Sequence, residues 1–412
     1  MNKTKKEEFK RMSNIGKILD SVNQRSLFKN KFVLQSNYSP ETIPHRDVQI
    51  DQVAAILAPS LIGQKTSNLF VYGKTGTGKT LTVQHVRDEL LRRAKDQKVL
   101  KIEYLNCKLK KVADTEYRIL AELIHKLGGS VPSTGLPTDV VYNKFLELLE
   151  NSDEKIIILI LDEIDQAVNK ISDNFLYNLT RLNSELSKIQ IGLVGISNDL
   201  RFLDSLDPRV RSSLSEEEIV FPPYNALQLQ DILKKRADEA FRIKAITPGA
   251  ISKCAAFAAR EHGDARRALD LLRVAGEIAE RAGNPRIELG HIDKANEKIE
   301  RDKILDIVET EPKQFQIVLY AIIQLTEKKK KEDKIFTGDV YTSYQELCNI
   351  TRVEVLTQRR VGDILSEFDM LGLINAKVIS KGRYGRTKDI KLSIPENILD
   401  KSKEILRDSL GI

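Results

Sequence analysis

A glycine-rich segment directly after an apolar strand constrains this chain more than any other feature. The strand pattern at 69–72 runs into residues 73–80, whose sequence is GKTGTGKT. Glycine lets the N–H groups of such a loop point inward at phosphate oxygens, where side chains would obstruct the approach. The pattern predicts a nucleoside triphosphate site, although a glycine-rich turn before a helix is also a plain structural solution.

The loop assigns separate roles to its residues if the ligand is ATP or ADP. Lys79 is expected to reach the β- and γ-phosphates, and the Thr80 hydroxyl is expected to bind Mg²⁺. The helix opened by Thr80 adds its positive N-terminal dipole behind the anion. The residues expected to hold the nucleotide here are Gly73, Lys74, Thr75, Gly76, Thr77, Gly78, Lys79, Thr80 and Leu81.

An unbroken apolar run that ends in acids gives the loop its context. Residues 156–165, IIILILDEID, predict a strand buried on both faces, as in the parallel sheet of an α/β domain. Asp162 falls at its carboxyl end, where a P-loop ATPase places the carboxylate that organises Mg²⁺. Glu163 is then placed to polarise the attacking water. A buried strand that merely enters a solvated acidic turn is disfavoured by the phosphate loop upstream.

Composition indicates a cytoplasmic globular protein of several domains. With 412 residues, of which 41% are hydrophobic, the chain can bury large cores but exceeds one ordinary domain. Its three cysteines are far apart, so neither a disulfide framework nor a zinc site is indicated. No export signal or membrane span is expected. The net charge of +7 favours an acidic partner such as nucleic acid, and the charged run 327–334 is interpreted as a solvated loop.

Further blocks follow in a particular order. Residues 190–199 predict another buried strand with a polar end, which places Asn198 beside the γ-phosphate. A basic turn follows at 206–214, and 219–224 predicts a short strand leaving the sheet. Helices then dominate, and in the block 263–273 Arg266 opens a helix whose Leu269 and Leu272 are free to pack.

Together these blocks resemble the AAA+ ATPases, and more narrowly the archaeal replication initiators related to eukaryotic origin-recognition and cell-division-control proteins. The resemblance runs nearly end to end and depends on residues 44–47, 73–80, 161–165, 195–199, 207–214, 221–224 and 263–267. It implies that Asn198 is sensor 1 and Arg266 is sensor 2. It also implies that Arg209 is the arginine finger, with Arg211 as second choice, although each could be an ordinary surface cation.

The resemblance further implies that the box at 44–47 packs near adenine. His45, Arg46 and Tyr224 are counted with the nucleotide-binding residues on this basis. Asp47 stands where family members usually carry Glu, and a proline-led turn with a helix cap at Asp47 is an equal alternative.

The expected fold class is an α/β P-loop AAA+ ATPase domain with a helical lid, followed by a C-terminal winged-helix domain. The predicted domains are 1–225 for the nucleotide-binding domain with an N-terminal extension, 226–311 for the lid with sensor 2, and 312–412 for the DNA-binding domain. A charged helix at 291–311 leads to Pro312, where the pattern changes. Helices at 315–325, 344–349 and 357–371 then precede strands at 373–379 and 389–394, which is the order of a winged helix.

The third helix of a winged helix usually enters the DNA major groove. Gln358, Arg359 and Arg360 lie near its start, where they are expected to contact bases or phosphates. The turn between the two strands carries a cluster of cations beside glycines, which suits a minor groove or the DNA backbone, whereas the alternative is a flexible basic turn. The residues expected to bind DNA from this hairpin are Lys381, Arg383, Tyr384, Arg386 and Lys388.

A second DNA contact is suggested at residues 128–138, where an initiator-specific insertion lies in the resembled family. Few cations occur there, so a contact would come through Thr138, backbone amides or a helix N-terminus. A connecting loop is an equal alternative.

The resemblance implies an ATP-dependent replication initiator that binds double-stranded origin DNA and helps recruit or load the replicative helicase. Weak ATPase activity would serve as a slow switch, with ATP or ADP and Mg²⁺ bound. Paralogous initiator subunits are expected as partners because an arginine finger acts on a neighbour's nucleotide. The expected location is the cytoplasm, on the chromosome and away from membranes.

Two other classes share parts of this pattern. A clamp-loader-type remodelling ATPase would have the same core but no need of a basic winged helix. A P-loop switch in signalling or transcription could carry the winged helix, but Asn198 and the block at 263–266 fit it poorly.

Overall fold

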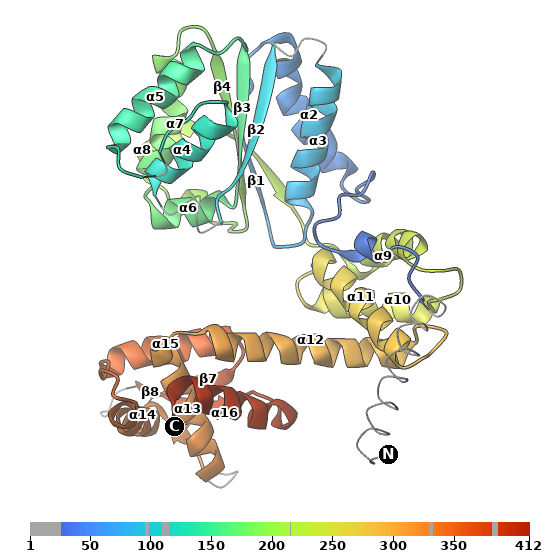
Figure 1. Cartoon of the computed structure of the whole chain (residues 1–412), viewed down its shortest axis with the longest axis vertical. Coiled ribbons are helices and arrows are strands. Elements are labelled where there is room, and N and C mark those ends of the chain that lie inside the picture. Colours follow the sequence, from blue (N-terminus) through green and yellow to red (C-terminus); the bar gives the residue numbers. More distant parts are fainter. Residues whose placement is uncertain are drawn as a thin grey trace, which may run out of the picture. The chain divides into compact units, whose positions relative to one another are not determined.

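The computed structural model describes residues 26–94, 99–108, 115–132, 134–214, 216–328, 333–380 and 386–412 (Figure 1). The chain divides into two compact units, one ending at Ile292 and the other running from Asp293 to Ile412. The helix α12, Leu289–Thr310, passes through this division. The domain limits predicted at 225/226 and 311/312 stay predictions. No helix within the described residues is long and apolar enough to cross a membrane.

The first unit contains a five-stranded parallel sheet in the order β2-β3-β4-β1-β5. Its strands are β1 Asn68–Gly73, β2 Leu100–Asn106, β3 Ile156–Asp162, β4 Gln190–Ser197 and β5 Glu216–Phe221. The register sets Asn106 beside Asp162 and Asp162 beside Ile196. Because all five strands run the same way, their carboxyl ends meet at one edge, and the polar residues that follow them gather there.

Helices cover both faces of the sheet, as Figure 1 shows. On one face, α2 Asp47–Leu57 and α3 Lys79–Arg93 pack on Val71 and Ile158. The other face, with Phe70 and Leu159, is covered by α4 Glu116–Lys126, α5 Thr138–Glu150, α6 Ile164–Lys170, α7 Asn174–Glu185 and α8 Pro208–Leu214. Neighbouring strand residues point to opposite faces, so each apolar strand contributes to both cores.

The expectation that the short strand at 219–224 leaves the sheet is wrong for residues 219–221. β5 begins at Glu216 and pairs in parallel with β1 along its whole length, so that Phe221 lies beside Gly73. The strand thus starts three residues before the predicted one, with Glu216, Glu217 and Glu218. As the edge strand, β5 needs only one buried face, and the buried residues are Ile219 and Phe221.

Three helices form the lid part of the first unit, together with the start of α12. They are α9 Ala226–Ala240, α10 Pro248–Arg260 and α11 Ala265–Arg281. Leu233, Cys254 and Leu272 are buried between them. α11 begins where the Asp264 side chain accepts hydrogen bonds from the backbone N–H groups of Arg266 and Arg267, which is a strong helix start.

The second unit has the helix order predicted for a winged helix. α13 Lys313–Lys328, α14 Thr337–Thr351 and α15 Gln358–Met370 pack on a three-stranded sheet in the order β6-β8-β7. The strands are β6 Ile335–Phe336, β7 Ile374–Ser380 and β8 Arg386–Leu392, and α16 Glu396–Leu410 closes the chain.

Three details of this unit differ from the sequence prediction. The second helix starts at Thr337 rather than near residue 344, and Thr342 bonds back to the Gly338 carbonyl inside it. β6 is only two residues long, which is too short for a periodic signal. α16 was missed, although Ile398, Leu406 and Leu410 make one buried face on it.

Candidate functional site

The phosphate loop closes tightly between β1 and α3. Gly76 and Gly78 both adopt positive φ angles, 72° and 90°. A Cβ on Gly76 would lie 1.7 Å from an Asp264 carboxylate oxygen, and the backbone N–H of Ala265 donates to the Gly76 carbonyl at 3.2 Å. Only glycine therefore permits the start of α11 to approach the loop this closely.

Lys79 lies at the centre of the loop and is only 4% exposed. Its Nζ donates to the carbonyl oxygens of Gly73 and Lys74 and to the side-chain oxygen of Asn198, at 2.7, 2.9 and 2.9 Å. All three acceptors are uncharged. Burial lowers the pKa of Lys79 to about 8. A buried cation with uncharged partners fits a site for an anion such as a phosphate group.

Two hydroxyl groups hold one oxygen of Asp162. Thr80 Oγ1 donates to Asp162 Oδ2 at 2.9 Å, and Tyr104 OH donates to the same oxygen at 2.7 Å. The other oxygen accepts the backbone N–H of Glu163 at 2.9 Å. Burial raises the pKa of Tyr104, so this phenol stays a donor throughout the physiological range. A hydroxyl and a carboxylate at this separation fit a hard cation such as Mg²⁺.

Glu163 follows β3 in a left-handed conformation, with φ at 54°. This conformation is uncommon for a residue with a side chain. Glu163 Oε2 lies 3.5 Å from the Nζ of Lys108, beyond the end of β2. Asn198 follows β4 and contacts Lys79.

A cavity of about 800 Å³ extends from the loop to the lid and the N-terminal segment. Thr75, Gly76, Gly78, Lys79, Thr80, Leu81, Asp162, Glu163, Asn198, Tyr224 and Arg266 are predicted site residues that line it. Arg266 is close enough to Lys79 for its positive charge to contribute to the lowered pKa of Lys79. The structure thus gathers most of the predicted nucleotide site around one cavity.

Other predicted residues lie behind the loop. Arg46 is 2% exposed, and its guanidinium donates to the carbonyls of Thr77 and Pro222 at 2.9 and 2.6 Å. It also stacks on Tyr224, with 3.8 Å between the guanidinium carbon and the ring centroid. His45 Nε2 lies 3.3 Å from an Asp231 oxygen. These contacts support the loop and join it to the lid, and neither residue lines the cavity.

The two candidate arginine fingers lie away from the cavity, on the surface around α8. Arg209 is 86% exposed and pairs with Asp207 at 3.1 Å. Arg211 is less exposed and pairs with Asp204 at 3.0 Å. Neither lines the cavity of its own chain, and the greater exposure of Arg209 suits a reach toward another subunit.

Predicted DNA contacts fall on several elements. Gln358, Arg359 and Arg360 are exposed on the first turn of α15, where Thr357 caps the helix. Thr138 is exposed as the first residue of α5. Lys388 lies within β8 rather than in the turn, and its Nζ donates to the Gly362 carbonyl on α15 at 3.1 Å. It joins the hairpin to the helix.

The remaining hairpin predictions are not tested by side-chain geometry. Lys381, Arg383 and Tyr384 lie outside the described residues, and only the backbone of Arg386, opposite Ser380, is described.

Sequence reasoning missed two parts of this site. Tyr104 and Asn106 on β2 line the cavity, as do residues 35–44 of the N-terminal segment. Tyr104 could have been predicted as a polar residue on a strand next to β3, but only if the strand order had been known. The N-terminal segment has no periodic pattern that would have placed it.

Comparison with known proteins identifies the family. An AAA domain matches residues 63–203, a Cdc6 AAA+ ATPase-type lid domain matches 230–297, and a CDC6 C-terminal winged helix domain matches 306–402. The chain is 52% identical over 375 residues to the ORC1-type DNA replication protein of Pyrococcus furiosus, over 90% of this chain and 88% of that protein. It is 49% identical over 389 residues to ORC1-type DNA replication protein 1 of Archaeoglobus fulgidus, over 94% and 93%.

A solved structure extends the likeness to three dimensions. The Aeropyrum pernix ORC1 protein in complex with DNA has a TM-score of 0.82 and 42% identity, over 92% of this chain and 97% of that chain. The predicted fold class, with AAA+ domain, lid and winged helix, is confirmed, and so is the predicted family. Because these relatives are ORC1-type DNA replication proteins, the comparison disfavours the two alternatives, a clamp loader and a signalling or transcription switch. This chain therefore belongs to the ORC1-type DNA replication proteins, which are AAA+ ATPases.

Proposed function

We propose that this protein initiates DNA replication by binding double-stranded origin DNA, with ATP binding and slow hydrolysis as its switch. The observation that carries the proposal is the likeness, along nearly the whole chain, to an ORC1 protein solved in complex with DNA. The exposed polar turn at the start of α15 supplies side chains that suit a DNA groove.

Nucleotide binding depends on the cavity between loop and lid. Lys79 and the loop amides hold the phosphates, because the hydrogen-bond acceptors of the buried ammonium are all uncharged and a phosphate would supply a charged one. Thr80 Oγ1 and Asp162 would hold Mg²⁺. When bound, Mg²⁺ would neutralise charge on the phosphate oxygens. Tyr224 and the N-terminal segment enclose the rest of the nucleotide.

Hydrolysis requires groups at the γ-phosphate end of the cavity. Glu163 orients the attacking water, and its pairing with Lys108 at 3.5 Å keeps the carboxylate at the end of β3. Asn198, which contacts Lys79, acts as sensor 1. Arg266 acts as sensor 2 from the first turn of α11, so lid position and phosphate contact change together.

Arg209 acts in trans on the nucleotide of a neighbouring subunit. Its exposure supports this role, since a finger must leave its own surface to stabilise charge elsewhere. Paralogous initiator subunits are the partners that this assignment requires. We further propose that the assembled protein helps recruit or load the replicative helicase, at the chromosome in the cytoplasm.

Most of the proposed contacts to DNA come from the second unit. Gln358, Arg359 and Arg360 enter the major groove from the first turn of α15. Lys388 fixes the hairpin on that helix, and Lys381, Arg383, Tyr384 and Arg386 extend the contact from the hairpin. Thr138 is a second contact, from the N-terminus of α5.

Footprinting on chromosomal fragments tests the proposal. The wild-type chain should protect discrete sites, and Arg359→Ala combined with Arg360→Ala should remove that protection. Lys401→Ala, which removes an exposed cation from α16, is the matched control and should leave the footprint intact. Equal loss in the control, or no site-specific protection by wild type at any salt concentration, would contradict the proposal.

A further inference from the structure

The N-terminal segment from Ser26 to Arg46, called the strap below, connects the lid to the phosphate loop. Its first residues lie on α11, its middle lines the nucleotide cavity from residue 35 to residue 44, and Arg46 ends beneath the loop. Residues 26–34 do not line the cavity. The strap therefore has an attachment on the lid that cannot touch the nucleotide directly.

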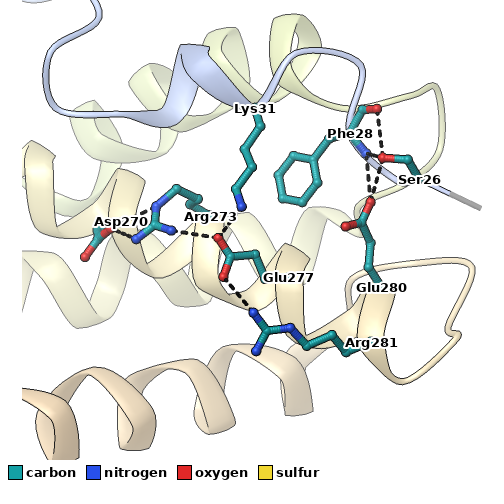
Figure 2. Close-up of polar contacts among 8 residues, drawn as sticks. All are labelled: Ser26, Phe28, Lys31, Asp270, Arg273, Glu277, Glu280 and Arg281. Carbon is teal, nitrogen blue, oxygen red and sulfur yellow. Dashed lines mark hydrogen bonds and ion pairs between the residues drawn. The ribbon is translucent and has the colours of Figure 1, made fainter. Parts of the chain in front are cut away.

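Glu280 on α11 holds the start of the strap (Figure 2). Its Oε1 accepts a hydrogen bond from Ser26 Oγ and another from the Leu27 backbone N–H, both at 2.7 Å. Charged acceptors make strong hydrogen bonds to backbone donors. One carboxylate thus fixes both the side chain and the backbone of the strap.

Phe28 then enters a notch in the lid. Its ring stacks on Phe241 with 4.7 Å between centroids. A Cβ on Gly276 would lie 2.5 Å from the tip of the Phe28 ring, so α11 has space for this ring only because residue 276 is glycine. The backbone N–H of Lys29 donates to the Ala240 carbonyl at 2.7 Å, beside the stacked rings. The attachment therefore combines apolar packing with backbone pairing.

A second carboxylate on α11, that of Glu277, contacts Lys31 of the strap. Its side chain is 11% exposed, and Lys31 Nζ approaches it to 2.6 Å. Arg273 and Arg281 also contact this carboxylate, at 2.7 and 3.7 Å, as Figure 2 shows. Because two lid arginines compensate Glu277 in any case, Lys31 adds to an existing charge cluster rather than creating one.

The rest of the strap continues this attachment toward the cavity. Tyr38 lies over the Arg236 guanidinium at 4.5 Å, and its OH donates to Glu239 at 3.0 Å, both on α9. At the far end, Arg46 donates to the Thr77 carbonyl of the phosphate loop. Lid, cavity wall and loop are therefore joined by one continuous piece of chain.

We propose that Glu280 and Gly276 are positioning residues for nucleotide binding, which act through the strap. When the strap is fixed on α11, residues 35–44 are held against the cavity, and the lid and the loop are held at one separation. If the strap is released, the cavity wall gains conformational freedom. Nucleotide binding must then order the wall again, and this entropy cost lowers the affinity. The proposal rests on the proposed nucleotide function of the cavity.

Two substitutions release the strap in different ways. Glu280→Ala removes the acceptor of Ser26 and Leu27. Gly276→Ala places a methyl group where the Phe28 ring lies, while alanine favours the helix itself. The matched control is Asp238→Ala, which removes an exposed acid from the lid helix α9. A common effect of the first two substitutions would point to the strap, since Glu280 bonds to Ser26 and Leu27 and Gly276 faces the Phe28 ring.

The experiment measures the affinity of the full chain for a fluorescent ADP analogue, and hydrogen exchange of the backbone amides at residues 27–31 with and without ADP. We expect both variants to bind about fivefold or more weakly, with unchanged affinity in Asp238→Ala. Because coupling is reciprocal, ADP should slow exchange at residues 27–31 in the wild type and not in either variant.

The possible results separate this proposal from the nucleotide function itself. If both variants exchange faster at 27–31 and yet bind ADP as the wild type does, the strap is only a structural attachment and the proposal is wrong. Lower thermal stability with unchanged ADP affinity has the same meaning. If the wild type does not bind the ADP analogue, the proposed nucleotide function fails instead.

Discussion

Replacing Lys79 by methionine should stabilise the nucleotide-free protein while abolishing its nucleotide affinity. Burial lowers the pKa of Lys79 from 10.5 to about 8. Keeping this ammonium charged in the folded state at about pH 7 therefore costs about 3 kcal/mol relative to the unfolded chain. Methionine has a similar length without the charge. The three oxygens that accept hydrogen bonds from Lys79 would then need water molecules as donors. We expect a net gain of about 1–3 kcal/mol in the free energy of unfolding.

The free energy of unfolding should also depend on pH differently in the wild type and in Lys79→Met. Because the folded-state pKa is the lower one, the unfolded chain binds more protons between about pH 8 and pH 10.5. Wild-type stability should rise in this interval, by up to about 1.4 kcal/mol per pH unit from Lys79 alone. The advantage of Lys79→Met should thus be complete below about pH 8 and disappear above about pH 10.5.

Urea denaturation followed by circular dichroism, at about pH 7 and about pH 10 without nucleotide, measures both effects. Lys65→Met is the control, since Lys65 is exposed and its replacement should change neither stability nor its pH dependence. Lower stability of Lys79→Met than of the wild type at neutral pH would contradict this prediction. So would a difference in stability between the two proteins that does not change with pH.

The other predictions concern single side chains. Glu163→Gln should bind ATP and lose hydrolysis, and a wild-type rate in a single-turnover assay would remove Glu163 from its role. Arg209→Ala should bind ATP normally but fail to stimulate turnover by a partner subunit; full stimulation in mixing experiments would move the role elsewhere. Tyr104→Phe removes one of the two hydroxyl groups that donate to Asp162 Oδ2 and should raise the Mg²⁺ concentration needed for tight ATP binding by about tenfold. Tyr72→Phe removes a buried hydroxyl that has no hydrogen-bond partner among the described residues, so it is the control, and an equal effect in both would speak against a positioning role. Arg359→Ala should lower the salt slope of DNA binding by about one if it contacts a phosphate, and an unchanged slope with lost site preference would indicate a base contact instead.

The sequence predicted those parts of the site in which local pattern and chemistry coincide. The loop around Lys79 and the acids after β3 each follow an apolar strand, and parallel strands bring such ends together. Asn198 was found for the same reason, at the end of β4. The contacts between these residues depend on the strand order, which could not be predicted from the sequence alone.

What escaped prediction depends on tertiary neighbours. Tyr104 is one residue of an ordinary alternating strand until β2 is placed beside β3. The strap has neither a helical nor a strand period, and its position follows from Phe28 in its notch and from Glu280. Residues 219–224 were expected to leave the sheet, whereas β5 pairs with β1 as an edge strand, where its three glutamates are tolerated.

The proposed role in replication initiation is tested most directly by a chromosome-wide map of the sites that this protein binds in living cells, aligned with the positions where replication begins. We expect a few discrete sites that coincide with replication starts, and their loss in the double variant Arg359→Ala and Arg360→Ala. Binding spread evenly along the chromosome, or concentrated at sites remote from every replication start, would contradict it.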